Sequence, residues 1–323
     1  MTYLTIFLTV AVPLAILKIY WKLNTRWNRS YKCLIGKTVL VTGSNTGIGY
    51  YTALDFAKRG AKVILACRNK IKGEEARKQI IKETNNDNVI LKVIDMESFE
   101  SVRNFANDFN RNEERLDILI NNAGISGVDY LTKDGYPVII QVNHLSPFLL
   151  THLLMNKLHK AGHSRIVNVA SNMVQTGKFE PKNLGLPVEM SHKTYRSTQY
   201  YSDSKLCNAV CTIEMNKRLK NTNIIVNALH PGVIITNIFD NQSKFITSIV
   251  YSFKWLFKTI EEGAQTTLYV ALSEDAGKSG GRFFNNCRDV GHYKNATDPD
   301  FARRVYEKCE KLVGLKPEEQ IKL

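Results

Sequence analysis

Short apolar runs alternate with amphipathic segments from about residue 36 to residue 284. Continuous apolar runs of this kind are typical of strands that are buried on both faces, as in a parallel sheet. Parallel strands need long connections between them, and the amphipathic segments can form these as helices. The alternation predicts a doubly wound α/β sheet in one globular domain. Its predicted strands lie at 38–41, 62–66, 89–94, 118–120, 166–169, 224–228 and 282–284.

Two of the predicted helices have clear end signals. Ser98 is an N-cap candidate, because its side-chain oxygen can accept from a free amide of the first turn. The stripe behind this cap carries Val102, Phe105 and Phe109. Asp298 and Pro299 indicate the start of a closing helix, and Gly314 lies past its end. The inner face of this closing helix carries Phe301, Val305, Cys309 and Leu312.

The N-terminal segment differs from the rest of the chain. Residues 3–20 are almost wholly apolar, and as a helix these ~18 residues would span roughly 27 Å, close to the thickness of a bilayer core. Lysines and arginines follow the apolar run and none precedes it, which favours a retained anchor over a cleaved signal peptide. We therefore expect a membrane anchor at 1–22, a basic linker at 23–35 and the catalytic domain at 36–323.

The placement of positive charge also predicts the orientation of this anchor. Basic residues flank a membrane span on its cytoplasmic side, so the domain after residue 35 is expected to face the cytoplasm. The protein is then a single-pass membrane protein, and the endoplasmic reticulum is the organelle we expect. The sequence leaves the oligomeric state open.

The 323-residue chain has a formal net charge of +14. Such a charge suits nucleic acid, an anionic membrane surface or an acidic cofactor. The lysines and arginines are spread along the chain, and no zinc finger, basic zipper or aromatic-basic motif organises them. Nucleic-acid binding is therefore not expected.

The six cysteines are scattered without a CxxC pair, which favours a reducing compartment. Cys207 and Cys211 can share one face of a helix. No histidine or acidic residue sits at matching spacing, so we interpret both cysteines as core residues and predict no metal site.

A glycine-rich segment follows the first predicted strand and opens an amphipathic stretch. Glycines there allow a tight turn and close approach of a pyrophosphate, and a helix N-terminus offers free N–H donors. The pattern is only moderately specific, since a glycine turn without a ligand would look the same. The predicted cofactor contacts of this segment are Gly43, Ser44, Asn45, Thr46, Gly47, Ile48 and Gly49.

The residue after the second strand predicts which cofactor is bound. In dinucleotide folds an acidic residue near this place accepts from the adenosine ribose and selects NAD. Here the position holds Arg68, whose guanidinium can pair with a 2′-phosphate, so NADP(H) is the predicted cofactor. The alternative is a solvent-facing arginine. Asp95, at the end of the third strand, is expected either to accept from the adenine amino group or to cap the helix after Ser98.

Small and polar residues follow the fourth strand, at the edge where open α/β sheets bind ligands. Asn122, Ala123 and Gly124 are predicted to leave room for the cofactor, and their amides could equally brace the loop. With these residues the chain resembles the short-chain dehydrogenase/reductase family over about 36–290, which implies a Rossmann-type fold. The motifs that carry the resemblance are Thr42-Gly43-x-x-x-Gly47-Ile48-Gly49, Asn121-Asn122-Ala123-Gly124, Asn143, Ser171, Tyr201-x-x-x-Lys205 and Pro231-Gly232.

The resemblance implies a proton relay for hydride-transfer chemistry. Tyr201 would exchange the proton of the substrate oxygen, and its phenol has an ordinary pKa of about 10 that must shift to be useful. Lys205, four residues on, faces the same side of a helix, and its charge would favour the phenolate. By resemblance, Ser171 would hydrogen-bond the substrate oxygen and Asn143 would hold a water in the proton path. The resemblance also implies nicotinamide contacts from Pro231, Gly232, Val233 and Thr236.

The segment after Gly232 is strongly apolar as far as Phe257, which suggests a flap over a lipophilic substrate. With the anchor, this flap makes the chain most similar to the retinol dehydrogenases of the family. That likeness implies NADP-dependent interconversion of retinol, or a similar long-chain alcohol, with its aldehyde, running as carbonyl reduction in cells. A steroid or other lipid ketone is the alternative substrate. A membrane-bound NADP-binding protein without turnover is the alternative outside enzymes.

Overall fold

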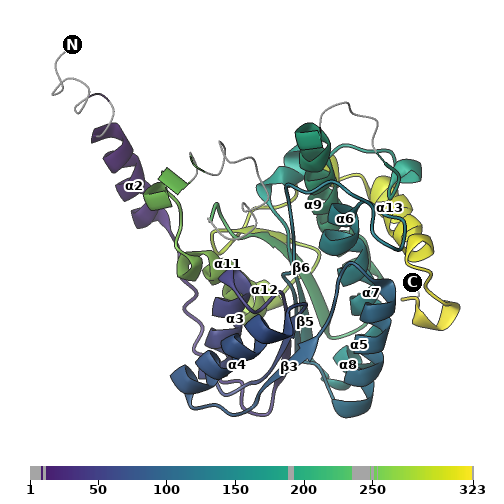
Figure 1. Ribbon diagram of the computed structural model, residues 1–323, viewed down its shortest axis with the longest axis horizontal. Coiled ribbons are helices and arrows are strands. Elements are labelled where there is room, and N and C mark those ends of the chain that lie inside the picture. Colours follow the sequence, from purple (N-terminus) through teal and green to yellow (C-terminus); the bar gives the residue numbers. More distant parts are fainter. Residues whose placement is uncertain are drawn as a thin grey trace.

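A single eight-stranded sheet runs through the centre of the computed structural model (Figure 1). The structure describes residues 9, 12–187, 193–234, 248, 251–252 and 254–321. The strand order is β3-β2-β1-β4-β5-β6-β7-β8, and every neighbouring pair is parallel except β7 and β8. The strands are β1 Thr38–Thr42, β2 Lys62–Cys67, β3 Val89–Val93, β4 Ile118–Asn121, β5 Ser164–Val169, β6 Ile224–His230, β7 Phe283–Asn285 and β8 Arg288–Asp289.

This architecture confirms the predicted doubly wound sheet, and the seven predicted strands match β1 to β7 within two residues at either end. Alternate residues of β1 point to opposite sides, with Leu40 in one apolar core and Val39 and Val41 in the other. Both faces are buried, which is why these strands read as continuous apolar runs. β8 was not predicted, because two polar residues, Arg288 and Asp289, give no periodic signal.

Helices cover both faces of the sheet (Figure 1). On one face lie α3 Gly47–Lys58, α4 Lys70–Thr84, α11 Ile260–Leu272 and α12 Glu274–Gly277. The other face carries α5 Phe99–Asn112, α7 Ser146–Leu153, α8 Met155–Lys160 and α9 Lys193–Arg218, and α13 Pro299–Leu312 packs on α9. The shorter elements are α6 Val138–Ile140, the π-helix η2 Gln141–Leu145 and the 3-10 turns η3 Asn172–Thr176, η4 Pro181–Asn183, η6 Lys254–Leu256, η7 Lys294–Ala296 and η8 Pro317–Glu319.

Both helix-end predictions are confirmed. Ser98 accepts from the amide of Ser101 at the start of α5, and its predicted apolar stripe is buried. Asp298 accepts from the amides of Asp300 and Phe301 at the start of α13. Gly314 follows that helix with a φ of +59°, a left-handed conformation that favours glycine.

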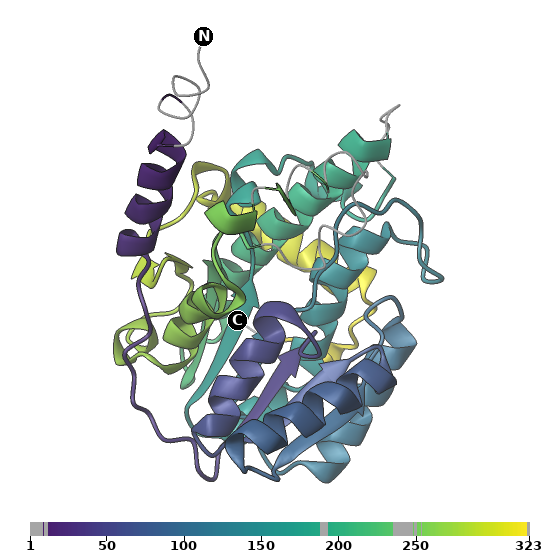
Figure 2. The same ribbon diagram turned by 60° about the vertical axis from the view of Figure 1, so that its left-hand side comes forward.

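The helix α2, Val12–Asn24, stands out from the body of the molecule (Figures 1 and 2). Its C-terminal half is held by Lys18, which donates to the carbonyl of Phe257 at 3.1 Å, and by an ion pair of Lys22 with Glu262 at 3.0 Å. Among the described residues there is no helix with the length and apolar character needed to cross a bilayer. Residues 1–8, 10 and 11 of the predicted anchor lie outside the described residues, so the anchor stays a prediction.

Candidate active site

A cleft of about 850 Å³ opens at the carboxyl ends of the strands. Its floor lies where the strand order reverses between β1 and β4, the place where ligands bind in open α/β sheets. Most of the predicted site residues line this one cleft, although they come from separate segments. They are Gly43, Asn45, Thr46, Gly47, Ile48, Gly49, Arg68, Asp95, Asn122, Ala123, Gly124, Ser171, Tyr201, Lys205, Pro231, Gly232 and Val233.

The glycine turn is shaped so that a phosphate can approach its backbone. Gly43 and Gly47 have φ values of +65° and +61°, which side chains disfavour. A methyl group on Gly49 would lie 2.4 Å from the carbonyl oxygen of Gly43, so only glycine fits there. Thr46 precedes α3 with no side-chain capping hydrogen bond within the described part of the chain. The first amides of α3 therefore remain available to an anion.

Hydrogen bonds from the loop after β4 hold the start of the glycine turn in place. The hydroxyl of Thr42 accepts from the amides of Asn122 and Ala123 at 2.9 and 3.0 Å. The Asn122 side chain in turn donates to the carbonyl of Thr42 at 2.8 Å. Both interpretations of Asn122 are thus compatible with the structure: its amide braces the loop, and the residue still lines the cleft.

Ser44 is the one residue of the predicted glycine-turn set that the structure places outside the cleft lining. Its side chain is fully buried and lies 3.6 Å from the sulfur of Cys67, facing β2. A contact of this buried side chain with a cofactor is therefore not supported, and a cofactor contact through the backbone of Ser44 stays a prediction.

Arg68 lines the predicted adenosine end of the cleft and is 62% exposed. Its guanidinium forms an ion pair with Glu97, and the other carboxylate oxygen of Glu97 accepts from the hydroxyl of Tyr130 at 3.0 Å. Lys72 adds a second cation to this wall of the cleft. Arg68 is thus largely exposed, as in the alternative of a solvent-facing arginine, and it also lines the cleft, so its pairing with a 2′-phosphate stays a prediction.

Asp95 has a local structural role in addition to its place in the cleft. One carboxylate oxygen accepts from the amide of Glu97 at 2.9 Å, and its backbone amide donates to the hydroxyl of Ser101 at the same distance. Ser98, rather than Asp95, caps α5. Contact of Asp95 with an adenine stays a prediction.

Ser171, Tyr201 and Lys205 meet at the other end of the cleft. Ser171 follows β5 and lies close enough to the phenol of Tyr201 on α9 to lower its pKa, and its hydroxyl donates to the side-chain oxygen of Asn172 at 3.3 Å. One turn along α9, the ammonium nitrogen of Lys205 lies 5.4 Å from the centre of the Tyr201 ring and donates to the carbonyl of Val169 at 2.9 Å.

The electrostatics of this trio differ from the sequence prediction. Burial raises the pKa of the Tyr201 phenol above its usual value, and the Ser171 hydroxyl lowers it only in part. Burial also lowers the pKa of Lys205 to about 8. Burial thus moves the phenol pKa in the direction opposite to the predicted lowering, and the effect of Lys205 on the phenol stays a prediction.

Asn143 lies behind the cleft wall instead of facing the cleft. It belongs to η2, and π-helical turns of this kind are frequent at functional sites. Its side chain accepts from the amide of Ile125 at 2.8 Å and donates to the carbonyl of Ile125 and to the hydroxyl of Ser204. Asn143 thus ties the loop after β4 to α9, next to Gly124. Its predicted water-holding role stays a prediction.

Pro231, Gly232 and Val233 follow β6 at the predicted nicotinamide end. Gly232 has a φ of +100°, and a methyl group there would lie 2.8 Å from Cδ of Lys258. Thr236 and most of the predicted apolar flap lie outside the described residues.

The sequence did not single out several residues of the cleft wall. His230, at the end of β6, has its pKa lowered to about 4 by burial and by the charge of Lys258. Its position at the carboxyl end of β6, where ligands bind in such sheets, could have marked it as a site residue. The remaining unpredicted residues had no motif to mark them, and they include Asn172, Met173, Ser197 and Thr198.

The residues of the cleft fit a nicotinamide dinucleotide. The glycine turn has no room for side chains where a pyrophosphate would approach, and the open end of α3 offers amide donors to it. Arg68 and Lys72 provide positive charge at one end, and Lys205 provides it at the other.

Comparison with known proteins agrees with this geometry. The family model described as short chain dehydrogenase matches residues 37–181. Retinol dehydrogenase 11 of Homo sapiens is 39% identical over 283 residues, 87% of each chain. Dehydrogenase/reductase SDR family member 13 of Bos taurus is 39% identical over 90% of this chain and 77% of its own.

Solved structures share the fold. An uncharacterized protein from Mycobacterium paratuberculosis superposes with a TM-score of 0.73 and 30% identity, over 90% of this chain and 99% of its own. L-sorbose reductase from Gluconobacter frateurii, solved with NADPH and L-sorbose, has a TM-score of 0.63 and 21% identity, over 81% of this chain and 98% of its own. The chain therefore belongs to the short-chain dehydrogenase/reductase family, whose members are oxidoreductases that use a nicotinamide cofactor.

Proposed function

We propose that this protein is an NADP(H)-dependent oxidoreductase that interconverts a lipophilic, retinol-like alcohol and its aldehyde or ketone. The observation that carries this proposal is the meeting of Ser171, Tyr201 and Lys205 in the same cleft as the glycine turn. The substrate class is supported by relatives named retinol dehydrogenase, which are 37% to 40% identical over 87% of the chain.

The nicotinamide ring, when bound, supplies or accepts the hydride. Tyr201 holds the proton that the substrate oxygen gains or loses, and Ser171 hydrogen-bonds the same oxygen. A raised pKa keeps the Tyr201 phenol protonated at neutral pH, which suits a proton donor in carbonyl reduction. Lys205 remains mostly charged below its pKa of about 8 and stabilises negative charge on the phenol as the proton leaves.

The preference for NADP(H) is supported by Arg68 and Lys72 at the adenosine end of the cleft. A guanidinium can pair bidentately with a phosphate, and in this structure Arg68 already pairs with the Glu97 carboxylate. A 2′-phosphate would take the place of that carboxylate beside Arg68. Because the Glu97 carboxylate lies beside Arg68, its negative charge is expected to weaken the preference for NADP(H) over NAD(H).

The proposed membrane attachment rests on exposed apolar side chains along α2. Ile16, Ile19, Tyr20 and Leu23 are all more than half exposed, which is unusual for a helix in water. Trp255 of η6 is also exposed. We place this surface in a membrane, with the catalytic domain on the cytoplasmic face of the endoplasmic reticulum. The expected result is that the protein stays in the membrane fraction after alkaline carbonate extraction, and its release would contradict the attachment.

The activity is tested with the purified full-length chain in detergent, using retinal, fatty aldehydes and steroid ketones with NADPH and with NADH. We expect the highest kcat/KM for retinal with NADPH. A higher value for a steroid ketone would identify the alternative substrate class. Binding of NADPH without turnover of any substrate would contradict the proposed activity and support a cofactor-binding protein instead.

A further inference from the structure

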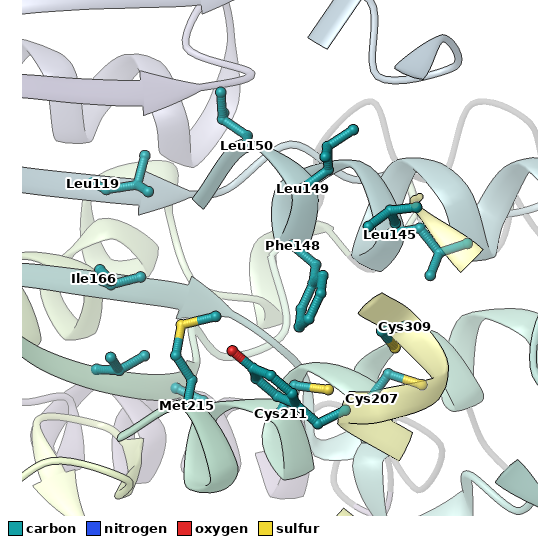
Figure 3. Packing of buried hydrophobic residues seen from close by; sticks show 14 of the residues in the cluster. Leu119, Leu145, Phe148, Leu149, Leu150, Ile166, Cys207, Cys211, Met215 and Cys309 are labelled. Atoms are coloured by element: carbon teal, nitrogen blue, oxygen red, sulfur yellow. The ribbon is translucent and has the colours of Figure 1, made fainter. Parts of the chain in front are cut away.

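A buried cluster of one histidine and two cysteines lies away from the cleft. His144 belongs to η2, Cys211 to α9 and Cys309 to α13, and all three are at most 4% exposed. The Nε2 atom of His144 lies 3.2 Å from Sγ of Cys309 and 3.6 Å from Sγ of Cys211. Figure 3 shows Cys211 and Cys309 in the core where α13 packs on α9. None of the three residues lines the described cleft.

A neighbouring asparagine determines the tautomer of His144. It thereby determines that the ring nitrogen facing the two sulfurs carries a lone pair and no hydrogen. The side-chain NH₂ of Asn208 donates to the carbonyl of Asn143 at 3.1 Å, which turns its oxygen toward His144. That oxygen lies 2.8 Å from Nδ1 of His144, so Nδ1 must carry the hydrogen. Nε2 is then unprotonated and directed at both thiols. This tautomer, fixed by a hydrogen bond from the far nitrogen, is the form in which histidine binds metals.

The distances match those of a tetrahedral metal centre. With Zn–S of about 2.3 Å and Zn–N of about 2.0 Å, a tetrahedral angle separates nitrogen and sulfur by about 3.5 Å. The observed separations of 3.2 and 3.6 Å need only a small adjustment to admit the ion. All three ligand atoms also lie within 4.8 Å of one another.

We propose that Nε2 of His144 and the sulfurs of Cys211 and Cys309 bind one thiophilic divalent cation, with Zn²⁺ as the expected ion. Binding releases two protons, one from each thiol, so two thiolates balance the two positive charges. A neutral centre of this kind is compatible with complete burial. Cys207, one turn before Cys211 on α9, is also a buried thiol, but its sulfur is not among the three ligand atoms that lie within 4.8 Å of one another.

This proposal replaces the prediction that the chain has no metal site. That prediction relied on local spacing, and His144 is 67 residues away from Cys211 in the sequence. The ion would join α13 to α9, the helix of Tyr201 and Lys205, and to η2, which carries Asn143. Its role is therefore structural: it holds the segments behind the cleft in place.

The test is the metal content of the full-length protein, purified in detergent under reducing conditions from cells grown with added zinc. We expect about one zinc ion per chain. Protein reconstituted with Co²⁺ should show thiolate-to-cobalt charge-transfer absorption and the intense visible bands of a tetrahedral site. The Cys211→Ala and Cys309→Ala variants should lose the metal and the absorption. Cys287→Ala, which removes another buried cysteine, should keep both.

Wild-type protein that holds no zinc, and that takes up neither zinc nor cobalt on reconstitution with its thiols reduced, would overturn the proposal. Folded Cys211→Ala and Cys309→Ala variants with full metal content would also overturn it. If these variants do not fold, the metal content and cobalt spectrum of the wild type still decide. None of these measurements depends on catalytic activity.

Discussion

At the scale of single residues, the cleft is defined by groups whose chemistry depends on their surroundings. The sequence alone gives Tyr201 and Lys205 their usual pKa values. Burial raises the pKa of Tyr201 and lowers that of Lys205, and both shifts favour the neutral form of the side chain. Arg68 is exposed, and its ion pair with Glu97 competes with the binding of an anion to its guanidinium. The two ends of the cleft are therefore tested by different substitutions.

Replacing Tyr201 by Phe removes the proposed proton donor and keeps the ring. We expect turnover of retinal with NADPH to fall by roughly 10²- to 10⁴-fold, the usual contribution of a general acid. Binding of NADPH, followed by its fluorescence, should change little. The matched control is Tyr200→Phe, since Tyr200 is buried in the core beside it and does not line the cleft. Equal activity of Tyr201→Phe and wild type would exclude the assigned role.

Replacing Arg68 by Asp puts a carboxylate where a 2′-phosphate is proposed to bind. The variant should lose at least about tenfold in NADPH affinity, because it loses a charge-assisted pair and gains a repulsion, whereas NADH affinity should hold or rise. The change in net charge is controlled by Lys82→Asp on the exposed far end of α4. If the ratio of NADPH to NADH affinity is the same in both variants, the phosphate-pairing proposal fails.

At the scale of elements, helix ends position the site. α3 begins with open amides at the phosphate end, whereas α11 begins with a complete capping box. Thr259 accepts from the amide of Glu262 at 3.1 Å, and the Glu262 carboxylate accepts from the amide of Thr259 at 2.9 Å. The residue before this cap, Lys258, packs on Gly232 at the nicotinamide end. The first amides of α3 are thus available to a ligand, whereas the capping box at the start of α11 stabilises that helix.

The Thr259→Ala variant should lower the free energy of unfolding by about 1 kcal/mol, since an N-cap oxygen is removed. Thr259→Ser keeps the hydroxyl and should stay close to wild type. Denaturant unfolding of the three proteins, followed by circular dichroism, measures the difference. Identical midpoints for the Ala and Ser variants would show that the cap does not stabilise α11.

At the scale of the whole molecule, the C-terminal helix α13 is attached to α7 through buried polar groups. Nδ1 of His152 lies 2.8 Å from the carbonyl of Phe148, and Nε2 lies 2.8 Å from the hydroxyl of Tyr306 on α13. The carbonyl can only accept, so Nδ1 donates and Nε2 accepts, and both nitrogens are satisfied in the neutral ring. Burial lowers the pKa of His152 to about 4.

This buried histidine predicts sensitivity to acid. Between pH 6.5 and about 4 the unfolded chain binds a proton at His152 that the native protein does not. The contribution of neutral His152 to the free energy of unfolding is therefore fully present above pH 6.5. It is lost as the pH falls toward 4, by about 3 kcal/mol in total.

The measurement is the thermal midpoint as a function of pH. The His152→Gln variant should be less stable at pH 7.5 and should show a shallower fall between pH 6.5 and 4. His159→Gln, at the exposed end of α8, should keep the steep fall of the wild type. A slope that His152→Gln leaves unchanged would assign the acid sensitivity to other groups.

The sequence determined the sheet, the glycine turn and the order of the motifs. Each of these depends on local physics: apolar runs form buried strands, Gly43 and Gly47 adopt left-handed turns, and Ser98 and Asp298 start helices. Short polar strands such as β8 have no periodic signal, so they were missed.

Only the tertiary structure decided which groups meet and in what environment. It turned Ser44 into the core, paired Arg68 with Glu97, and brought His144 to Cys211 and Cys309. It also raised the pKa of Tyr201, where the spacing to Lys205 alone predicts a lowering. The physical reason is that desolvation and long-range contacts depend on the packing of distant segments, which local spacing does not encode.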